Sequence, residues 1–268
     1  MNLFDLTGEI AVVLGGTGVL GGAIAAGLAG SGAKVVVAGR HAGRGGERAD
    51  AITKAGGAAV FFEADVSSKE SLENLLAKAQ GHFGTPTVLV NAAGGNNPKV
   101  TVSAENRFEN IAAGDWSACF DLNLIGGALL PCQVFGPALV AAKKGSIINI
   151  ASVSAHLPLS NVVAYSAAKA AVLNLTQFLA REWAPHQVRV NSLTPGFFPA
   201  EQNRRLLFNP DGSPTPRAAS ILAHTAMARF GSADELVGAA VFLASPKAAS
   251  FVTGIDLRVD GGFLSQTI

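Results

Sequence analysis

Tyr165 and Lys169 are the residues whose types and spacing could carry acid–base chemistry. Tyr165 is the single tyrosine of the chain, and Lys169 follows it four residues later, so on a helix the two side chains would share one face. A phenol titrates at about pH 10 on its own. An ammonium nearby favours the ionised form, which lets the phenol exchange a proton with a carbonyl or alcohol oxygen closer to neutral pH. A surface pair without a function would have the same spacing, so this motif needs support from elsewhere in the chain.

A glycine-rich segment near the start of the chain could hold a phosphate. Residues 15–22 read GGTGVLGG and lie between a short apolar run and an alanine-rich stretch. Glycines permit a tight turn and let backbone N–H groups approach a pyrophosphate at the N-terminus of a helix. Such a segment could also only loosen a loop, but its place after the first strand and before a helix favours dinucleotide binding. The candidate contacts are Gly15, Thr17, Gly18, Leu20 and Gly21.

The end of the second predicted strand bears on which nicotinamide cofactor binds. An acid there would accept hydrogen bonds from a free ribose 2′-hydroxyl, whereas a 2′-phosphate favours a guanidinium. Here Gly39 and Arg40 follow the strand, and the next acid is Glu47. Arg40 is therefore a candidate ligand of the 2′-phosphate, and NADP is the expected cofactor. If Arg40 is only a solvated loop residue, NAD is the alternative.

Alternating strands and helices must position these residues. Most of the strand candidates are continuous apolar runs, which are typical of a parallel sheet covered on both faces. Their alternation with helical stretches predicts a doubly wound α/β sheet. The predicted strands are Ile10–Leu14, Lys34–Ala38, Ala59–Phe62, Thr87–Val90, Ser146–Ile150, Val188–Leu193 and Asp256–Val259. The predicted helices are Leu20–Ser31, Lys69–Phe83, Trp116–Lys143, Ala164–Trp183 and Ala233–Ala244.

The chain reads as a single domain over residues 1–268. It shows no fixed-period repeat and no interdomain linker. The one long irregular segment, about Pro195 to Gly231, is interpreted as a lid over the substrate at about residues 196–231 rather than as a domain boundary.

Composition excludes several classes of protein. Charged residues make up 15% and hydrophobic residues 49%, so the signature of disorder is missing. Twenty basic residues against nineteen acidic ones give a net charge of +1, which argues against nucleic-acid binding and against a polybasic membrane anchor. Two cysteines cannot build a disulfide framework or a zinc site by themselves, and no metal site is expected. Without an export signal or an uninterrupted apolar span of about 20 residues, we expect a cytoplasmic protein that does not enter a membrane.

With these motifs in place, the chain resembles the short-chain dehydrogenase/reductase family. The matching residues occur in the family's order and span nearly the whole chain, and Ser152 precedes Tyr165 by thirteen residues, as in the family. The matches are Gly15–Gly21, Asp65, Asn91–Gly94, Asn123, Ser152, Tyr165, Lys169, Pro195–Gly196, Phe251–Gly254 and Val259–Gly262. The resemblance implies a Rossmann-type sheet of about seven strands and hydride transfer at the nicotinamide.

The resemblance also implies a role for each catalytic residue. Tyr165 would be the general acid in carbonyl reduction and the general base in alcohol oxidation, while Ser152 would orient the reacting oxygen. Lys169 would bind the nicotinamide ribose and lower the pKa of the tyrosine. Asn123 would hold a water that connects Lys169 to solvent.

Further cofactor contacts follow from the same resemblance. Asp65 and Val66 would flank the adenine, and the segment from Asn91 to Gly94 would close the cleft. The full set of implied contacts outside the glycine segment is Asp65, Val66, Asn91, Ala92, Gly94, Tyr165, Lys169, Pro195, Gly196 and Phe198.

Three positions depart from the family pattern. Leu14 stands where a threonine usually begins the glycine motif, which removes a structural hydrogen bond toward the segment at Asn91. Val19 replaces the middle glycine of that motif, and Ala200 replaces a threonine that often touches the nicotinamide carboxamide.

Within the family, the chain is most similar to the D-mannonate oxidoreductase (fructuronate reductase) group. The similarity rests on residues 15–21 (GGTGVLG), on residues 91–99 (NAAGGNNPK), on the segment PGFF that begins at Pro195, and on the lid sequence from Glu201 to Ser213. A sugar acid needs a cation for its carboxylate and polar groups for its hydroxyls. The candidate substrate contacts are Asn96, His156, Gln202, Asn203, Arg204 and Arg205. Adjacent arginines cannot both face one pocket from a short helix, and the apolar lid residues are interpreted as packing.

Two other readings remain open from the sequence. The chain could reduce another small ketone or a 3-oxoacyl thioester, or it could be an inactive nucleotide-binding module on the same scaffold. The intact set of Asn123, Ser152, Tyr165 and Lys169 argues against the inactive module. The resemblance further implies a homotetramer.

Overall fold

The computed structural model describes residues 2–159, 161–200 and 204–267. Seven parallel strands form one sheet in the order β3-β2-β1-β4-β5-β6-β7. They are β1 (Ile10–Leu14), β2 (Lys34–Gly39), β3 (Ala58–Glu63), β4 (Val88–Asn91), β5 (Gly145–Ile150), β6 (Val188–Pro195) and β7 (Asp256–Val259). All seven predicted strands are confirmed, and the Rossmann-type fold with them.

The strand order reverses between β1 and β4, and this reversal creates the crevice in which open α/β sheets bind ligands. The in-register pairs Leu14↔Ala38 and Leu14↔Asn91 place the carboxyl ends of β2, β1 and β4 side by side. The glycine segment, Arg40 and the residues after Asn91 therefore meet at one edge of the sheet.

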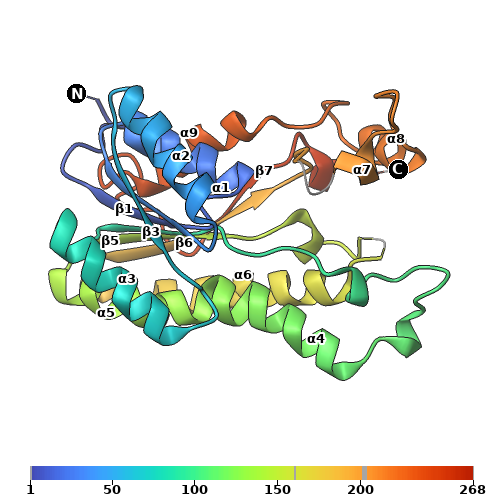
Figure 1. Ribbon diagram of the computed structural model, residues 1–268, viewed down its shortest axis with the longest axis horizontal. Helices are drawn as coiled ribbons and strands as arrows, with labels where there is room; N and C mark the ends of the chain where they lie inside the picture. Colours follow the sequence, from blue (N-terminus) through green and yellow to red (C-terminus); the bar gives the residue numbers. More distant parts are fainter. Residues whose placement is uncertain (1, 160, 201–203, 268) are drawn as a thin grey trace.

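Helices cover both faces of the sheet (Figure 1). On one face α1 (Val19–Gly30) and α9 (Val237–Ala244) pack on the apolar side chains of the strands, with α2 (Ala42–Lys54) beside them. On the other face lie α3 (Lys69–His82), α4 (Ala113–Phe120), α5 (Leu130–Ala142) and α6 (Val163–Trp183). Two separate apolar cores result, one on each face of the sheet.

Helix α2 was not predicted from the sequence. Its three glycines have low helix propensity, which hides it from a pattern search. Tertiary packing overrides that propensity, because Ala49 and Ile52 are buried and Gly45 lies against the ring of Phe61, where any Cβ would collide.

The predicted helix Trp116–Lys143 is a helical run from Ala113 to Ala142 whose middle part, Asp121–Leu129, is a π-helix. Pro131 follows this segment and has no N–H to donate to the preceding turn, which fits a local change in hydrogen bonding. π-Helical segments within α-helices often mark functional sites, and this one carries Asn123. The run is long and apolar enough to span a membrane by length and composition, but half of it is buried in the protein, as in a core helix.

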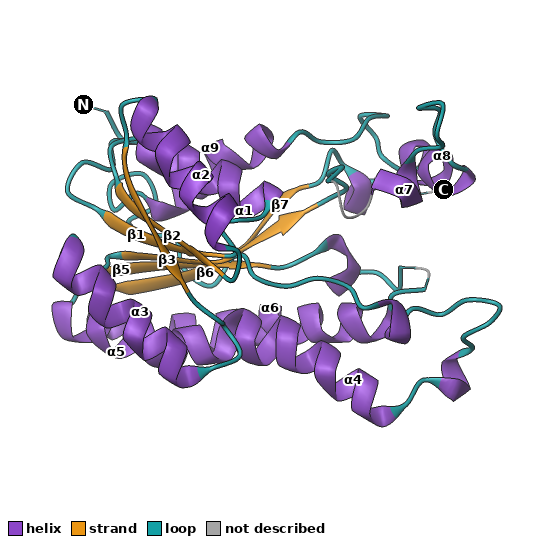
Figure 2. Cartoon of the chain, in the orientation of Figure 1, coloured by secondary structure: helices purple, strands orange, loops and turns teal. Residues whose placement is uncertain are grey.

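The segment predicted to be an irregular lid contains two short helices, α7 (Arg204–Leu207) and α8 (Pro216–Ala223). They lie beyond the carboxyl ends of the strands (Figure 2). Thr215 caps α8 by accepting a hydrogen bond from the N–H of Ala218, and Pro216 occupies the first helical turn. Leu207, Ala218 and Ile221 form a small core of their own with Phe208 and Phe230, so these apolar residues are packing, as expected. The expectation is wrong for Leu206, which is 59% exposed.

Candidate active site

Tyr165 and Lys169 share one face of α6 close to its N-terminus. The Lys169 side chain is buried, and its Nζ donates a hydrogen bond of 2.7 Å to the carbonyl oxygen of Ile150 at the end of β5. The same Nζ lies 5.8 Å from the centre of the Tyr165 ring. The helical spacing read from the sequence therefore brings the phenol and the ammonium together at the carboxyl edge of the sheet.

Ser152 stands opposite them, where β5 ends and a short 3₁₀-helix (Val153–Ala155) begins. Its hydroxyl accepts hydrogen bonds from the backbone N–H of Ser154 (3.2 Å) and from the Ser154 hydroxyl (3.0 Å). It also lies within hydrogen-bonding reach of Tyr165. Ser154 was not singled out from the sequence, although its place two residues after Ser152 was a usable signal.

The protein's own groups keep the Tyr165 phenol protonated. Burial raises its pKa, the hydrogen bond with Ser152 opposes that rise, and the nearby Cys119 adds to it. The Lys169 ammonium is hydrogen-bonded to the carbonyl oxygen of Ile150, and the expectation that it lowers the pKa of Tyr165 stays a prediction. Tyr165 is thus a proton donor at neutral pH, which suits carbonyl reduction.

Burial lowers the pKa of Lys169 to about 8, with Cys119 partly opposing the change. The folded protein thus releases this proton at lower pH than the unfolded chain, so the stabilising contribution is present above about pH 10.5 and is lost as pH falls to about 8. We expect the free energy of unfolding of the wild type to rise by roughly 3 kcal/mol relative to Lys169→Met over that interval. Urea titrations of both proteins at several pH values measure this difference. Parallel pH profiles would contradict it.

Asn123 is fully buried in the π-helical segment and holds the loop after β4. Its Nδ2 donates to the carbonyl oxygens of Gly95 and Cys119, and its Oδ1 accepts from the N–H of Gly95, each at 2.9 Å. Gly94 has φ +151°, and a Cβ there would lie 2.8 Å from Asn123 Oδ1. The carboxamide thus positions this loop, and the water that Asn123 is expected to hold stays a prediction.

The glycine segment forms a tight turn between β1 and α1. Gly15 has φ +77°, and a Cβ on it would lie 2.7 Å from the backbone of Ala92, so only glycine fits. Gly18 caps α1, and among the described residues no side chain caps that helix and no acid stands in its first turn. The helix N-terminus therefore keeps its positive end open to an anion. Val19 is exposed and does not fill the turn.

Arg40 and Asp65 meet where the adenosine end of a dinucleotide would lie. Both follow strand ends, and the charge of Arg40 helps to lower the pKa of Asp65, after the stronger effect of hydrogen bonds from the Ser67 hydroxyl and N–H. Arg40 is exposed, so its guanidinium is available to a ligand, while Val66 is buried beside Asp65.

Asn91 belongs to a buried polar chain. Its Nδ2 donates to Asn149 Oδ1 (2.8 Å), and Asn149 Nδ2 donates to Thr176 Oγ1 (2.9 Å), which ties β4 and β5 to α6. Asn91 Oδ1 has no partner among the described residues. Leu14, its in-register neighbour on β1, offers no donor, in agreement with the hydrogen bond expected to be missing there.

The last implied cofactor contacts lie at the end of β6. Gly196 donates its N–H to Val259 O (3.0 Å), and its Cα packs so closely on Asp260 that a Cβ would lie 2.7 Å away. The side chain of Phe198 is buried in the apolar core and packs against Gly231, so its cofactor contact stays a prediction.

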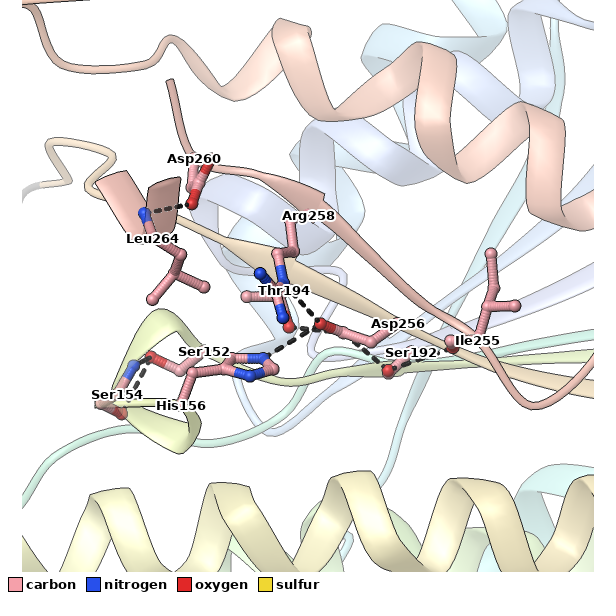
Figure 3. Close-up of polar contacts among 10 residues, drawn as sticks. All are labelled: Ser152, Ser154, His156, Ser192, Thr194, Ile255, Asp256, Arg258, Asp260 and Leu264. Carbon is pink, nitrogen blue, oxygen red and sulfur yellow. Dashed lines mark hydrogen bonds and ion pairs between the residues drawn. The ribbon is translucent and has the colours of Figure 1, made fainter. Parts of the chain in front are cut away.

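The predicted substrate contacts do not all come together. Asn96 is exposed and donates to Thr101 Oγ1 (2.8 Å), and the guanidinium of Arg204 lies over the Phe208 ring at 5.7 Å. The ring of His156 faces Asp256 on β7 (Figure 3). Gln202, Asn203 and the side chain of Arg205 lie outside the described part of the chain.

These features fit a nicotinamide dinucleotide. The open helix N-terminus would hold its pyrophosphate, Arg40 and Asp65 its adenosine end, and Lys169 its ribose. When bound, the nicotinamide supplies or accepts a hydride. Ser152 would then orient the substrate oxygen, and Tyr165 would donate or accept the proton.

Comparisons with known proteins agree with this reading. A family model described as enoyl-(acyl carrier protein) reductase matches residues 17–264. The uncharacterized oxidoreductase UxuB of Bacillus subtilis (strain 168) is 42% identical over 98% of this chain and 97% of its own. A structure from Haemophilus influenza, described as a D-mannonate oxidoreductase with bound NAD, has a TM-score of 0.92 at 36% identity, covering 98% of this chain and 97% of that one. A gluconate 5-dehydrogenase from Burkholderia cenocepacia J2315, in complex with NADP and tartrate, has a TM-score of 0.89 at 31% identity and covers 99% of both chains.

Fold and site define an oxidoreductase that uses NAD or NADP and acts on a CH–OH or carbonyl group. The chain belongs to the short-chain dehydrogenase/reductase family.

Proposed function

We propose that this enzyme interconverts the ketone and secondary alcohol of a sugar acid of the D-mannonate/D-fructuronate type, with NADP(H) as preferred cofactor. The observation that carries the reaction type is the convergence of Ser152, Tyr165 and Lys169 beside the dinucleotide crevice. The similarity to structures described as sugar-acid oxidoreductases supports the substrate class.

In the proposed reduction, the substrate carbonyl lies between Ser152 and Tyr165. The Ser152 hydroxyl, whose oxygen accepts a hydrogen bond from the Ser154 hydroxyl, donates a hydrogen bond to the carbonyl oxygen when the substrate is bound. Tyr165 delivers its proton to the same oxygen as hydride reaches the carbon.

A panel of sugar acids and their keto forms, assayed with both cofactors, tests the substrate class. We expect turnover of D-fructuronate or D-mannonate to exceed that of neutral ketones and polyols. Because the family model is named for acyl carrier protein reductases, acetoacetyl thioesters belong in the panel, and a preference for them would replace the proposal by reduction of 3-oxoacyl groups.

The segment 196–231 is proposed to act as a lid that supplies the cation for the substrate carboxylate. We expect Arg204→Ala and Arg205→Ala to differ, since successive helical residues point about 100° apart. Arg204 already stacks on Phe208, so its variant should have the smaller effect, and Arg205→Ala should raise KM for a carboxylate substrate about tenfold. Measuring KM for a carboxylate and for a neutral ketone separates lost charge from lost packing. If neither variant changes this discrimination, the cation lies elsewhere, with Lys99 the next candidate.

We further propose a cytoplasmic homotetramer. Phe178 on α6 and Phe251 before β7 are large apolar side chains exposed on the single chain, by 51% and fully, as interface residues would be. Sedimentation equilibrium at several protein concentrations tests the assembly.

A further inference from the structure

A polar cluster lies at the outer edge of the sheet, where β7 begins beside β6 (Figure 3). Asp256 on β7 is its centre, and its Oδ1 accepts hydrogen bonds from the hydroxyls of Ser192 (2.7 Å) and Thr194 (2.6 Å) on β6. The other carboxylate oxygen, Oδ2, lies 3.0 Å from Nε2 of His156 and 3.6 Å from Nε of Arg258. The carboxylate is therefore fixed on one side by two hydroxyls and faces the histidine on the other.

His156 is joined to Ser152 by one short helix. It ends the short helix that begins at Ser152, and its backbone N–H donates to Val153 O (3.1 Å). The side chains of His156 and Asp256 are only 19% and 18% exposed. Among the described residues, Nε2 and Oδ2 have no well-aligned hydrogen-bond partner. Their approach to 3.0 Å is favourable only with a proton between them, because a carboxylate oxygen only accepts.

We propose that His156 and Asp256 form a positioning pair that fixes the Ser152 helix against the β6–β7 edge. The pair rests on the proposed function, because its purpose is to hold the Ser152 hydroxyl in register with Tyr165 and with Gly196, where β6 leaves the sheet. His156 is then a positioning residue and not the substrate ligand expected from the sequence. Supporting contacts of this kind hold the groups that do chemistry in place, and the support is lost when either partner is removed.

The test compares His156→Leu, which removes the ring N–H, with His156→Gln, which keeps an N–H donor. A misplaced reacting group costs up to about a hundredfold in rate, so we expect His156→Leu to lower kcat ten- to a hundredfold. KM for the substrate and Kd for the cofactor should stay within about threefold of wild type. His156→Gln should recover most of kcat. His186→Leu, at an exposed histidine before β6 at the opposite end of the sheet, is the matched control and should leave kcat unchanged.

A double-variant cycle tests the pairing itself. If the two residues act as one unit, His156→Leu combined with Asp256→Ala should be no slower than the slower single variant. If the fold-decreases in kcat of the two single variants multiply in the double variant, the two residues act independently and the proposed pair is wrong. An unchanged kcat in His156→Leu would also overturn the pair, as would a raised substrate KM at unchanged kcat, which would make His156 a substrate ligand.

Amide hydrogen exchange provides a readout that needs no substrate. The N–H groups of Ala155 and His156 are bonded within the short helix, and their protection should fall at least about tenfold in His156→Leu and return in His156→Gln. Should the wild type turn over none of the carbonyl panel, the proposed function fails while this measurement still decides the pair. Unchanged protection would overturn it.

Discussion

Tyr165→Phe is expected to lower kcat by about 10²–10⁴-fold, since a positioned acid or base contributes rate enhancements of that size. The ring packs with Val100, Cys119 and Ala164, and phenylalanine preserves this packing. Neither the melting temperature nor the Kd for the cofactor should therefore change by much. Steady-state kinetics and a cofactor titration by fluorescence give both quantities.

Ser152→Ala is the matched comparison for the tyrosine variant, because it removes a neighbouring hydroxyl without removing the proton donor. If Tyr165→Phe retains kcat within a few-fold of wild type, Tyr165 has no part in proton transfer.

Arg40→Ala is expected to lower kcat/KM for NADPH by about ten- to a hundredfold, which corresponds to a lost charged hydrogen bond. The kcat/KM for NADH should change little, because NADH has a 2′-hydroxyl and offers the guanidinium no anion at that position. Arg44→Ala, an exposed arginine in the first turn of α2, is the control. The prediction fails if the wild type has a tenfold higher kcat/KM for NADH than for NADPH and Arg40→Ala changes neither value. Arg40 would then be a loop residue that does not bind the 2′-phosphate.

A second experiment introduces a carboxylate at Gly39, beside the expected position of the cofactor ribose, in order to favour NADH. The packing around Gly39 limits which substitutions are possible. A Cβ at Gly39 would lie 2.8 Å from Thr17 Oγ1 and 2.9 Å from Thr17 Cγ2, so Gly39→Asp alone would strain the turn. Combined with Thr17→Ala, which removes both atoms, Gly39→Asp should shift preference toward NADH by charge repulsion. Thr17→Ala alone separates the effect of the threonine.

The sheet could be predicted from the sequence because each strand is a short, continuous apolar run. The Tyr165–Lys169 pair could be predicted because helical spacing is a local property. Helix α2 could not be predicted in this way, since it is stabilised by tertiary packing, including that of Gly45 on Phe61, and not by high helix propensity. The burial that raises the pKa of Tyr165 could not be predicted in this way, because it depends on segments that are distant in the sequence.

The contact between His156 and Asp256 could not be predicted from local sequence patterns. Asp256 lies one hundred residues later in the chain and meets His156 only because β7 pairs with β6 at the edge of the sheet. The position of His156 between Ser152 and Tyr165 predicted that it borders the site, but not the direction in which its ring points.

The number of residues in the π-helical segment Asp121–Leu129 determines how α4 and Asn123 are oriented relative to α5. An α-helix turns by about 100° for each residue, so deleting one residue there would rotate all of α4 relative to α5 by about that angle. Asn123 could then no longer reach the backbone of Gly95. Natural relatives that keep this active site should therefore tolerate substitutions along the helix far better than single insertions or deletions within this turn.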